Sequence, residues 1–356
     1  MISTLHDLQP FHFPEFFTPE EIEYRNIYYR RSAEFSERVI VTYEHVKSDI
    51  VRYYDIPTDK IDVCPFGTPD RSCISEVEIR RVRFCYHLPD IYLLYPANTW
   101  RHKNHTTLLT ALGRLRDVYG TTIRLVCTGH QQEDYFPELV RQIEMLNIGA
   151  QVQFTGFLSE EDMPAVVAGA TLVVIPTLYE AGSLPLVEAM SYAVPVICSN
   201  VTSLPDTIGD ERFVFDPLDV EGLTDLIYRM LTDESLRQDN ILNSRRRRDE
   251  MGWEKAVTSF IDSYRRAVEG FQTKRNLPYY ISWIANGEFF FCDSISSLRS
   301  EAHQLGEELR SVRDSASGDV CSCAEDARGS QRGIEAARTS RLYKVLKMVT
   351  WRKRQH

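Results

Sequence analysis

The chain has 356 residues, of which 43% are hydrophobic and 26% are charged, as is usual for a globular protein. Its 41 Lys and Arg against 51 Asp and Glu give a formal net charge of −10, which argues against wholesale binding to nucleic acid. No apolar run approaches the roughly 18 residues of a membrane span, and the first residues lack the basic and apolar blocks of a signal peptide.

From about residue 38 onward, short apolar runs alternate with stretches of helical periodicity. Strands are expected at 38–43, 60–67, 91–97, 122–129, 151–157, 171–177 and 194–200. Helices are expected at 44–54, 105–119, 136–146, 163–170, 184–193, 219–233 and 253–271. Because the apolar runs are nearly continuous, both faces of the sheet are expected to be covered. This alternation predicts an α/β fold with a doubly wound parallel sheet, in which ligands bind at the carboxyl ends of the strands.

Two carboxylates, Glu180 and Glu188, flank the small-residue turn "AGS" that follows the strand expected at 171–177. Small side chains let a ligand approach the backbone, and the first N–H groups of the next helix favour a phosphate. Glu188, about one turn into that helix, is within reach of hydroxyls on the same ligand. A sugar nucleotide has these parts. The alternative from the two glutamates alone is that Glu180 caps the helix and Glu188 is a solvated helical residue.

Residues 91–112 and 152–206 resemble the donor-binding domain of glycosyltransferase family 4, a family of retaining enzymes with the GT-B fold. The two glutamates match the E-x7-E motif of that family, and the resemblance extends over roughly residues 1–270. Several separated segments occur in the order of the family, so the resemblance favours an active site over an ordinary helix start.

The resemblance implies that Glu180 contacts hydroxyls of the transferred sugar and that Glu188 contacts the ribose. Backbone N–H groups near Gly182, Ser183 and Leu184 are then expected to hold the phosphates. The usual turn of the family reads E-G-F-G, whereas this chain reads "EAGS", so small residues are kept but the glycine position moves.

In "TWRHKNH", Lys103 corresponds to the family lysine that faces the diphosphate. A fixed cation there would neutralise charge that builds up on the leaving group. The family often has an arginine a few residues earlier, and here either Arg101 substitutes for it or Lys103 works alone. The resemblance also implies that Gly129 opens a loop towards the nucleotide and that Thr202 donates a hydrogen bond beside the diphosphate. Ser203 is an equally good donor or a helix cap.

The segment 4–20 resembles the later part of the family's acceptor domain. His6 begins an H-D-L motif, and the family histidine at this place lies close to the donor sugar. Tyr43 is a departure, because many relatives carry serine at this position or the next. Only about seventy residues precede "PFGTP", so the first strands of the acceptor domain are expected to be missing. The explanations considered are a misplaced gene start, a partner chain that supplies the rest, and a decayed gene.

The expected organisation has four parts. Residues 1–70 form a partial acceptor-side domain, 71–235 the donor-binding domain, 236–272 helices that pack back on the domains, and 273–356 an extension. In that extension, 315–333 reads as a flexible linker. The last stretch, 338–356, has seven basic residues, no acidic one and one apolar helical face. It is predicted to lie on an anionic membrane surface or to dock on the protein itself.

Eight scattered cysteines, several of them in apolar strand-like runs, are typical of reduced thiols in a cytoplasmic protein. The "CSC" at 321–323 lacks a second pair of ligands, so no zinc site is expected.

The sequence thus predicts a retaining glycosyltransferase that uses a GDP- or UDP-sugar. Mannose is the favoured sugar, because "YPANTWRHKNH" resembles the mannosyltransferase branch. No metal is expected, since no Asp-x-Asp motif is placed to hold one. The expected acceptor is a cell-surface polysaccharide or a lipid-linked sugar, and the expected location is cytoplasmic, at the inner membrane face. The alternative is a non-catalytic sugar-nucleotide-binding subunit that needs a partner chain. A dinucleotide oxidoreductase is disfavoured, because no G-x-G-x-x-G follows the strand at 91–97.

Overall fold

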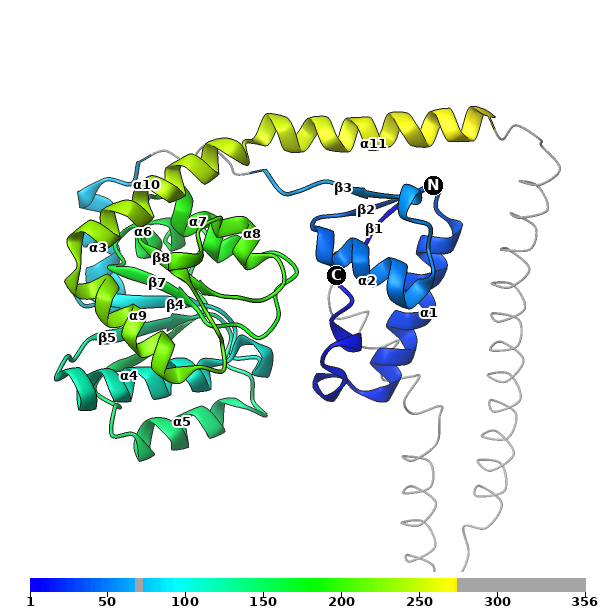
Figure 1. Cartoon of the computed structure of the whole chain (residues 1–356). Coiled ribbons are helices and arrows are strands. Elements are labelled where there is room, and N and C mark those ends of the chain that lie inside the picture. Colours follow the sequence, from blue (N-terminus) through cyan, green and yellow to red (C-terminus); the bar gives the residue numbers. More distant parts are fainter. Residues whose placement is uncertain (68–72, 274–356) are drawn as a thin grey trace, which may run out of the picture. The chain divides into compact units, whose positions relative to one another are not determined.

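The N-terminal part of the chain is built on a parallel sheet of three short strands in the order β1–β2–β3 (Figure 1). The computed structural model describes residues 1–67 and 73–273. The strands are β1 (Ile2–Thr4), β2 (Arg38–Val41) and β3 (Ile61–Val63). Buried aliphatic residues of β2 pack with α2 into a small core. The two helices are α1 (Pro19–Phe35) and α2 (Glu44–Tyr54), and 3-10 turns lie at Gln9–Phe11, Pro14–Phe16 and Thr58–Lys60.

A six-stranded parallel sheet, in the order β6–β5–β4–β7–β8–β9, forms the centre of the following domain. Its strands are β4 (Tyr92–Pro96), β5 (Arg124–Thr128), β6 (Val152–Gly156), β7 (Leu172–Ile175), β8 (Val196–Ser199) and β9 (Val214–Phe215). The chain order reverses on either side of β4, so the loops after β4 and β7 diverge from a topological switch point. The expected doubly wound α/β fold is confirmed.

Helices cover both faces of this sheet, because its strands are apolar at nearly every position. They are α3 (Glu76–Tyr86), α4 (His105–Tyr119), α5 (Phe136–Met145), α6 (Met163–Ala168), α7 (Leu184–Ser191), α8 (Leu204–Ile208) and α9 (Val220–Thr232). Two 3-10 turns lie at Arg101–Lys103 and Glu211–Phe213. The strands and the inward faces of these helices share one hydrophobic core.

Two further helices, α10 (Glu234–Glu250) and α11 (Trp253–Thr273), follow the domain. Helix α11 packs on β2 and is tied to β3 through the buried carboxylate of Asp62. That carboxylate accepts hydrogen bonds from Arg38 on β2, at 2.8 Å, and from Ser263 and Arg266 on α11, at 2.7 Å and 2.8 Å. Burial opposes the charge of Asp62, but the hydrogen bonds from Arg38 and Ser263 hold its pKa below the usual value.

The expected strands and helices within the described ranges all occur, with ends that differ by a few residues. The sequence analysis did not identify α1, α3, α8 or the two-residue strand β9. The limits proposed at 70, 235 and 272 stay predictions. The expected linker at 315–333, the "CSC" pair and the basic stretch at 338–356 lie outside the described residues.

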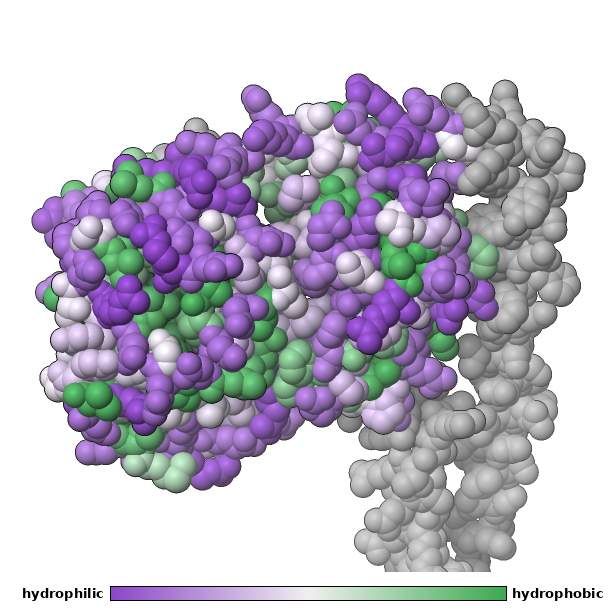
Figure 2. All heavy atoms as spheres, viewed as in Figure 1, coloured by the Kyte–Doolittle hydropathy of each residue, from purple (hydrophilic) through white to green (hydrophobic). Residues whose placement is uncertain are grey.

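Hydrophilic residues cover much of the visible surface, and hydrophobic ones gather in smaller areas between them (Figure 2). Within residues 1–67 and 73–273, none of the helices combines the length and the apolar character that crossing a bilayer requires.

Helix α4 begins with a buried histidine. The His105 ring, 1% exposed, lies against Tyr95 of β4 with ring centroids 4.7 Å apart. Burial, together with the nearby charge of Lys103, lowers the pKa of His105 to about 3. The imidazole is therefore neutral at pH 7 and forms part of the core behind the β4–α4 turn.

We predict that Asp62→Asn destabilises the protein by about 3 kcal/mol, because Arg38 would lose its anionic partner in a buried site. Urea unfolding at pH 7 measures the change. The matched control is Asp117→Asn, which removes the partner of Arg116 at an exposed position and should leave the transition unchanged. Equal shifts in the two variants would contradict the role given to Asp62.

We also predict a pH effect from His105. An imidazole with a pKa near 6.5 in the unfolded chain and about 3 in the folded one binds its proton more readily after unfolding. Stability should therefore fall as the pH is lowered below 6.5, by up to about 1.4 kcal/mol per pH unit from this group. Between pH 7 and pH 5, the free energy of unfolding measured with urea should fall less in His105→Phe than in the wild type. In the exposed-site control His130→Phe it should fall as much as in the wild type.

Candidate active site

An ion pair lies at the carboxyl edge of the six-stranded sheet, between the loops that follow β4 and β7. Lys103 Nζ is 2.7 Å from Glu180 Oε2, and the two side chains are 16% and 11% exposed. The two residues are 77 positions apart in the sequence, and both were predicted from the sequence as site residues. The structure brings them into direct contact at the edge where parallel sheets bind their ligands.

The position of Lys103 is fixed by residues that the sequence analysis did not select. The buried Tyr95 hydroxyl donates to the Lys103 carbonyl at 2.7 Å. Asn104 adopts a left-handed backbone with φ of 57°, and its amide donates to the carbonyls of Pro176 and Pro217, both at 2.9 Å. This buried amide joins the loops that follow three strands. An asparagine directly after the lysine was the available signal, since asparagine tolerates left-handed backbone better than most residues.

The β7–α7 loop, which carries Glu180, is held by hydroxyl groups. Ser199 at the end of β8 donates to the Thr177 carbonyl at 2.6 Å. The Thr177 hydroxyl in turn lies 3.0 Å from the carbonyl of His102 and 2.8 Å from that of Tyr179. These bonds connect the loops after β4, β7 and β8 without using a charged side chain.

Thr202, which was expected to face a diphosphate, contacts the backbone of Glu180. Its Oγ1 donates to the Glu180 carbonyl at 2.6 Å and accepts from the Glu180 N–H at 3.3 Å. Ser203, the next residue, has its Oγ 3.4 Å from the same carbonyl and makes no side-chain cap on α8. In this structure, both hydroxyls of the β8–α8 turn therefore support Glu180.

Helix α7 begins beside this ion pair. Ser183 caps it by accepting a hydrogen bond from the Leu186 N–H at 3.4 Å. The alternative in which Glu180 caps the helix is therefore wrong, because Ser183 holds that position and Glu180 pairs with Lys103. Leu184, the first residue of α7, is 61% exposed, so solvent reaches the amino end of the helix.

Glu188 lies one turn further along α7 and is half-buried. Together with Ser183 and Leu184 it lines a pocket of about 230 Å³. The same pocket is lined by Tyr43, Phe66, Gly67, Val187, Ser191 and Trp253. Glu188 therefore shares a hollow with the amino end of its own helix, while Glu180 contacts Lys103 on the other side of the turn.

Gly182 is in close contact with Tyr43, which lies at the start of α2. A Cβ added at Gly182 would be 2.5 Å from Tyr43 Cε2, closer than any real contact. Only glycine leaves room for the ring at this turn. Burial raises the pKa of the Tyr43 phenol, so it remains a protonated hydrogen-bond donor at pH 7. The two departures from the family pattern, at Tyr43 and in "EAGS", thus meet in one contact.

Arg101 and Gly129 occupy neighbouring loops. The guanidinium of Arg101 is paired with Glu138 at 3.0 Å and lies 4.5 Å above the Tyr135 ring, so Lys103 is the residue that contacts Glu180. Gly129 has φ of 101°, and a Cβ there would lie 2.8 Å from the Asn98 side chain. The glycine is needed where the β5–α5 loop passes the β4–α4 loop.

His6 lies on the loop after β1 and is exposed. Its ring stacks on Phe66, with centroids 6.3 Å apart, and Phe66 lines the pocket that Glu188 shares. The role given to His6 by the resemblance stays a prediction.

Lys103 carries its positive charge between two histidines that are neutral at pH 7. Burial and the adjacent Lys103 charge lower the pKa of His102 to about 4. With His105 also neutral, the two histidines beside Lys103 add no positive charge at pH 7. An anionic ligand at this turn would therefore interact chiefly with the ammonium group of Lys103.

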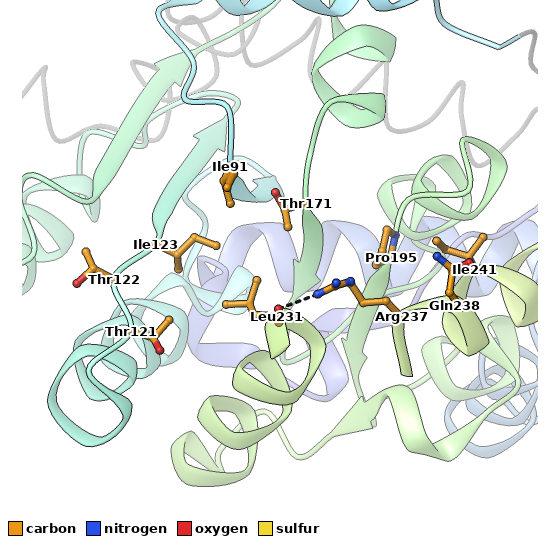
Figure 3. A pocket seen from close by; sticks show the side chains of 10 residues that line it. All are labelled: Ile91, Thr121, Thr122, Ile123, Thr171, Pro195, Leu231, Arg237, Gln238 and Ile241. Carbon is orange, nitrogen blue, oxygen red and sulfur yellow. Dashed lines mark hydrogen bonds between the residues drawn. The ribbon is translucent and has the colours of Figure 1, made fainter. Parts of the chain in front are cut away.

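A larger hollow of about 540 Å³ lies at the opposite edge of the sheet (Figure 3). It is lined by Ile91, Thr121, Thr122, Ile123, Thr171, Pro195, Leu231, Arg237, Gln238 and Ile241. Several of these residues directly precede a strand, so the hollow is at the amino ends of the strands. Its cation, Arg237, already donates to the carbonyls of Met230 and Leu231. Size alone therefore does not make this hollow the active site.

Comparisons with known proteins show which sequences and folds this chain resembles. Residues 87–247 match the family model described as glycosyl transferases group 1. This matched segment contains Lys103, Glu180 and Glu188.

Among curated relatives, the chain is 29% identical over 275 residues to O-antigen chain mannosyltransferase B of Escherichia coli, covering 74% of this chain and 70% of the relative. It is 25% identical over 277 residues to the serotype-specific mannosyltransferase WbdA of Escherichia coli, covering 76% of this chain. The match spans only 34% of that longer relative.

Solved structures show the same fold. Sucrose-phosphate synthase from Thermosynechococcus elongatus superposes with a TM-score of 0.63 at 22% identity, over 75% of this chain and 68% of that one. Anabaena Alr3699/HepE, in complex with UDP and glucose, gives a TM-score of 0.65 at 18% identity, over 74% of this chain and 71% of that one. Together, the matched residues 87–247, the mannosyltransferase relatives and the shared fold make the chain similar to group 1 glycosyltransferases of the GT-B type, and in particular to bacterial mannosyltransferases.

Proposed function

We propose that this chain transfers a hexose, with mannose as the first candidate, from a nucleotide-diphosphate sugar to a hydroxyl acceptor. The observation that carries the proposal is the Lys103–Glu180 ion pair, 2.7 Å long and largely buried, at the carboxyl edge of the sheet. The bond to be broken joins the sugar to the diphosphate. A cation at this place suits the diphosphate, and a carboxylate beside it suits the hydroxyls of the sugar.

Each charged group has a role in this proposal. Lys103 binds the diphosphate and stabilises the negative charge that grows on it as the sugar leaves. The amino end of α7, at Leu184, adds the partial positive charge of a helix terminus. Glu180 accepts hydrogen bonds from hydroxyls of the sugar, and Glu188 accepts them from the ribose. Because Lys103 and the helix end carry the charge, we propose that transfer needs no bound metal.

The ion pair must rearrange when a donor binds. Two opposite charges removed from water are stable only while each has a partner. A diphosphate that approaches Lys103 replaces the Glu180 carboxylate as the anion, and the freed carboxylate then meets the sugar hydroxyls. Donor binding thus exchanges one set of charge-assisted hydrogen bonds for another, and neither charged group is left without a hydrogen-bond partner.

The acceptor and the stereochemistry are also part of the proposal. The mannosyltransferase relatives in O-antigen synthesis support a glycan acceptor at the cell surface or on a lipid carrier. We propose retention of the anomeric configuration and placement of His6 beside the donor sugar, both by analogy with the family. The GDP form of the donor follows from the choice of mannose, and UDP-sugars are the alternative.

We predict that Glu180→Gln lowers the turnover of GDP-mannose, measured as GDP released by hydrolysis or transfer, by about 10²-fold. Glutamine keeps the shape of the side chain and an acceptor for Lys103 but loses the charge. Lys103→Met should weaken binding of GDP by about tenfold or more in isothermal titration and weaken binding of guanosine little. Addition of EDTA should leave the wild-type turnover unchanged.

The control is Glu221→Gln, which removes an exposed partner of Arg114 far along the sequence from the turn. It should behave like the wild type. If neither GDP nor UDP binds to the wild type or to the control, the proposed donor class is refuted. Binding without any turnover would instead favour the non-catalytic subunit.

Membrane attachment through residues 338–356 is a separate proposal, based on their seven basic residues and absence of acidic ones. We predict that the full chain floats with liposomes that contain anionic lipid and that a chain ending at residue 337 does not. Binding should fall at high salt because the attraction is electrostatic. Equal flotation of both chains would contradict the proposal.

A further inference from the structure

Thr202 has an unusual backbone conformation. It lies in the turn between β8 and α8 with φ of 49°, in the left-handed region. A β-branched residue rarely adopts this region, because the conformation is strained and persists only where the surroundings impose it. Glycine or asparagine would fit the turn with less strain, so a specific contact of the threonine side chain must offset the cost.

That contact is with the backbone of Glu180. The Thr202 hydroxyl donates to the Glu180 carbonyl at 2.6 Å and accepts from the Glu180 N–H at 3.3 Å. A hydroxyl has one proton to donate and lone pairs to accept with, so both bonds form together. The residue that carries the carboxylate is therefore held by its backbone from one side and by Lys103, through its side chain, from the other.

The turn itself does not need this hydroxyl. Leu204 N–H donates to the Val201 carbonyl at 3.1 Å, and the Thr207 hydroxyl donates to the Ser203 carbonyl at 2.7 Å. These bonds close the turn and the start of α8 without Thr202. The strained conformation thus serves the neighbouring loop more than its own.

We propose that Thr202 is a positioning residue for Glu180. Its left-handed backbone aims the hydroxyl across the gap between the β7–α7 and β8–α8 loops and fixes the direction in which the Glu180 carboxylate points. This inference rests on the proposed function, in which Glu180 contacts the donor sugar. It differs from the sequence-based expectation, in which Thr202 itself contacts the diphosphate.

The test compares three substitutions in the full chain. Thr202→Val keeps the β-branched shape and loses both hydrogen bonds. It should lower kcat for GDP release from GDP-mannose by about tenfold to a hundredfold, because a catalytic group is misplaced, and change KM by less than about threefold. Thr202→Ser keeps the hydroxyl and should stay near the wild type. Thr202→Gly should lose turnover as the valine variant does. Its urea midpoint should equal or exceed that of the valine variant, because glycine adopts the left-handed backbone without strain.

Thr224→Val is the matched control, since it removes a buried threonine hydroxyl that, within the described part of the chain, donates to the Val220 carbonyl of the same helix. It should leave kcat unchanged. A Thr202→Val variant with kcat within twofold of the wild type would overturn the proposal. So would a rise in KM at constant kcat, which would mean that Thr202 contacts the donor directly. Full turnover in Thr202→Gly would overturn it as well.

A second readout is independent of activity. Amide hydrogen exchange at Glu180 should become faster in Thr202→Val than in the wild type and remain slow in Thr202→Ser, because the N–H loses its acceptor in the valine variant and keeps it in the serine variant. Unchanged exchange would overturn the inference. A wild type that releases neither GDP from GDP-mannose nor UDP from UDP-glucose would refute the proposed function instead, and the exchange rates would still decide about Thr202.

Discussion

The contact between Lys103 and Glu180 is the constraint on which the candidate site depends. Two side chains from different loops, each less than one-fifth exposed, meet at 2.7 Å. Each charge has lost most of its water and needs the other, so any shift of one loop relative to the other leaves a charge unpaired. The ion pair therefore favours one arrangement of the loops after β4 and β7, and in the proposed function the two side chains exchange partners when the donor binds.

Neutral side chains make most of the hydrogen bonds that connect the loops around this ion pair. Hydroxyls of Thr177, Ser199 and Thr202 and the amide of Asn104 connect the loops through backbone carbonyls. The histidines on either side of Asn104 are uncharged at pH 7 because burial lowers their pKa. Such a scaffold fixes geometry without adding competing charge, so the field at the turn comes mainly from one ammonium group and one carboxylate.

Tyr43 and Gly182, two places where the sequence departs from the expected family pattern, fit against each other. Tyr43 lies at the start of α2, and its ring approaches Gly182 in the turn before α7. A larger residue at position 182 would clash with this ring, and a smaller one at position 43 would leave a gap. Tyr43 lines the same pocket as Glu188 and Ser183, so its phenol places a hydrogen-bond donor beside the amino end of α7.

The parallel α/β fold follows from the amino-acid sequence, because uninterrupted apolar runs must be buried on both faces of a sheet. The placement of Lys103 and Glu180 at the same sheet edge follows from it as well, because both residues come after strands. The sequence analysis missed β9, since two residues carry no periodicity. The folded chain alone shows that Arg101 pairs with Glu138 and that Thr202 holds Glu180. These contacts join residues on different loops, and the local residue pattern does not reveal which side chain will find a partner on another loop.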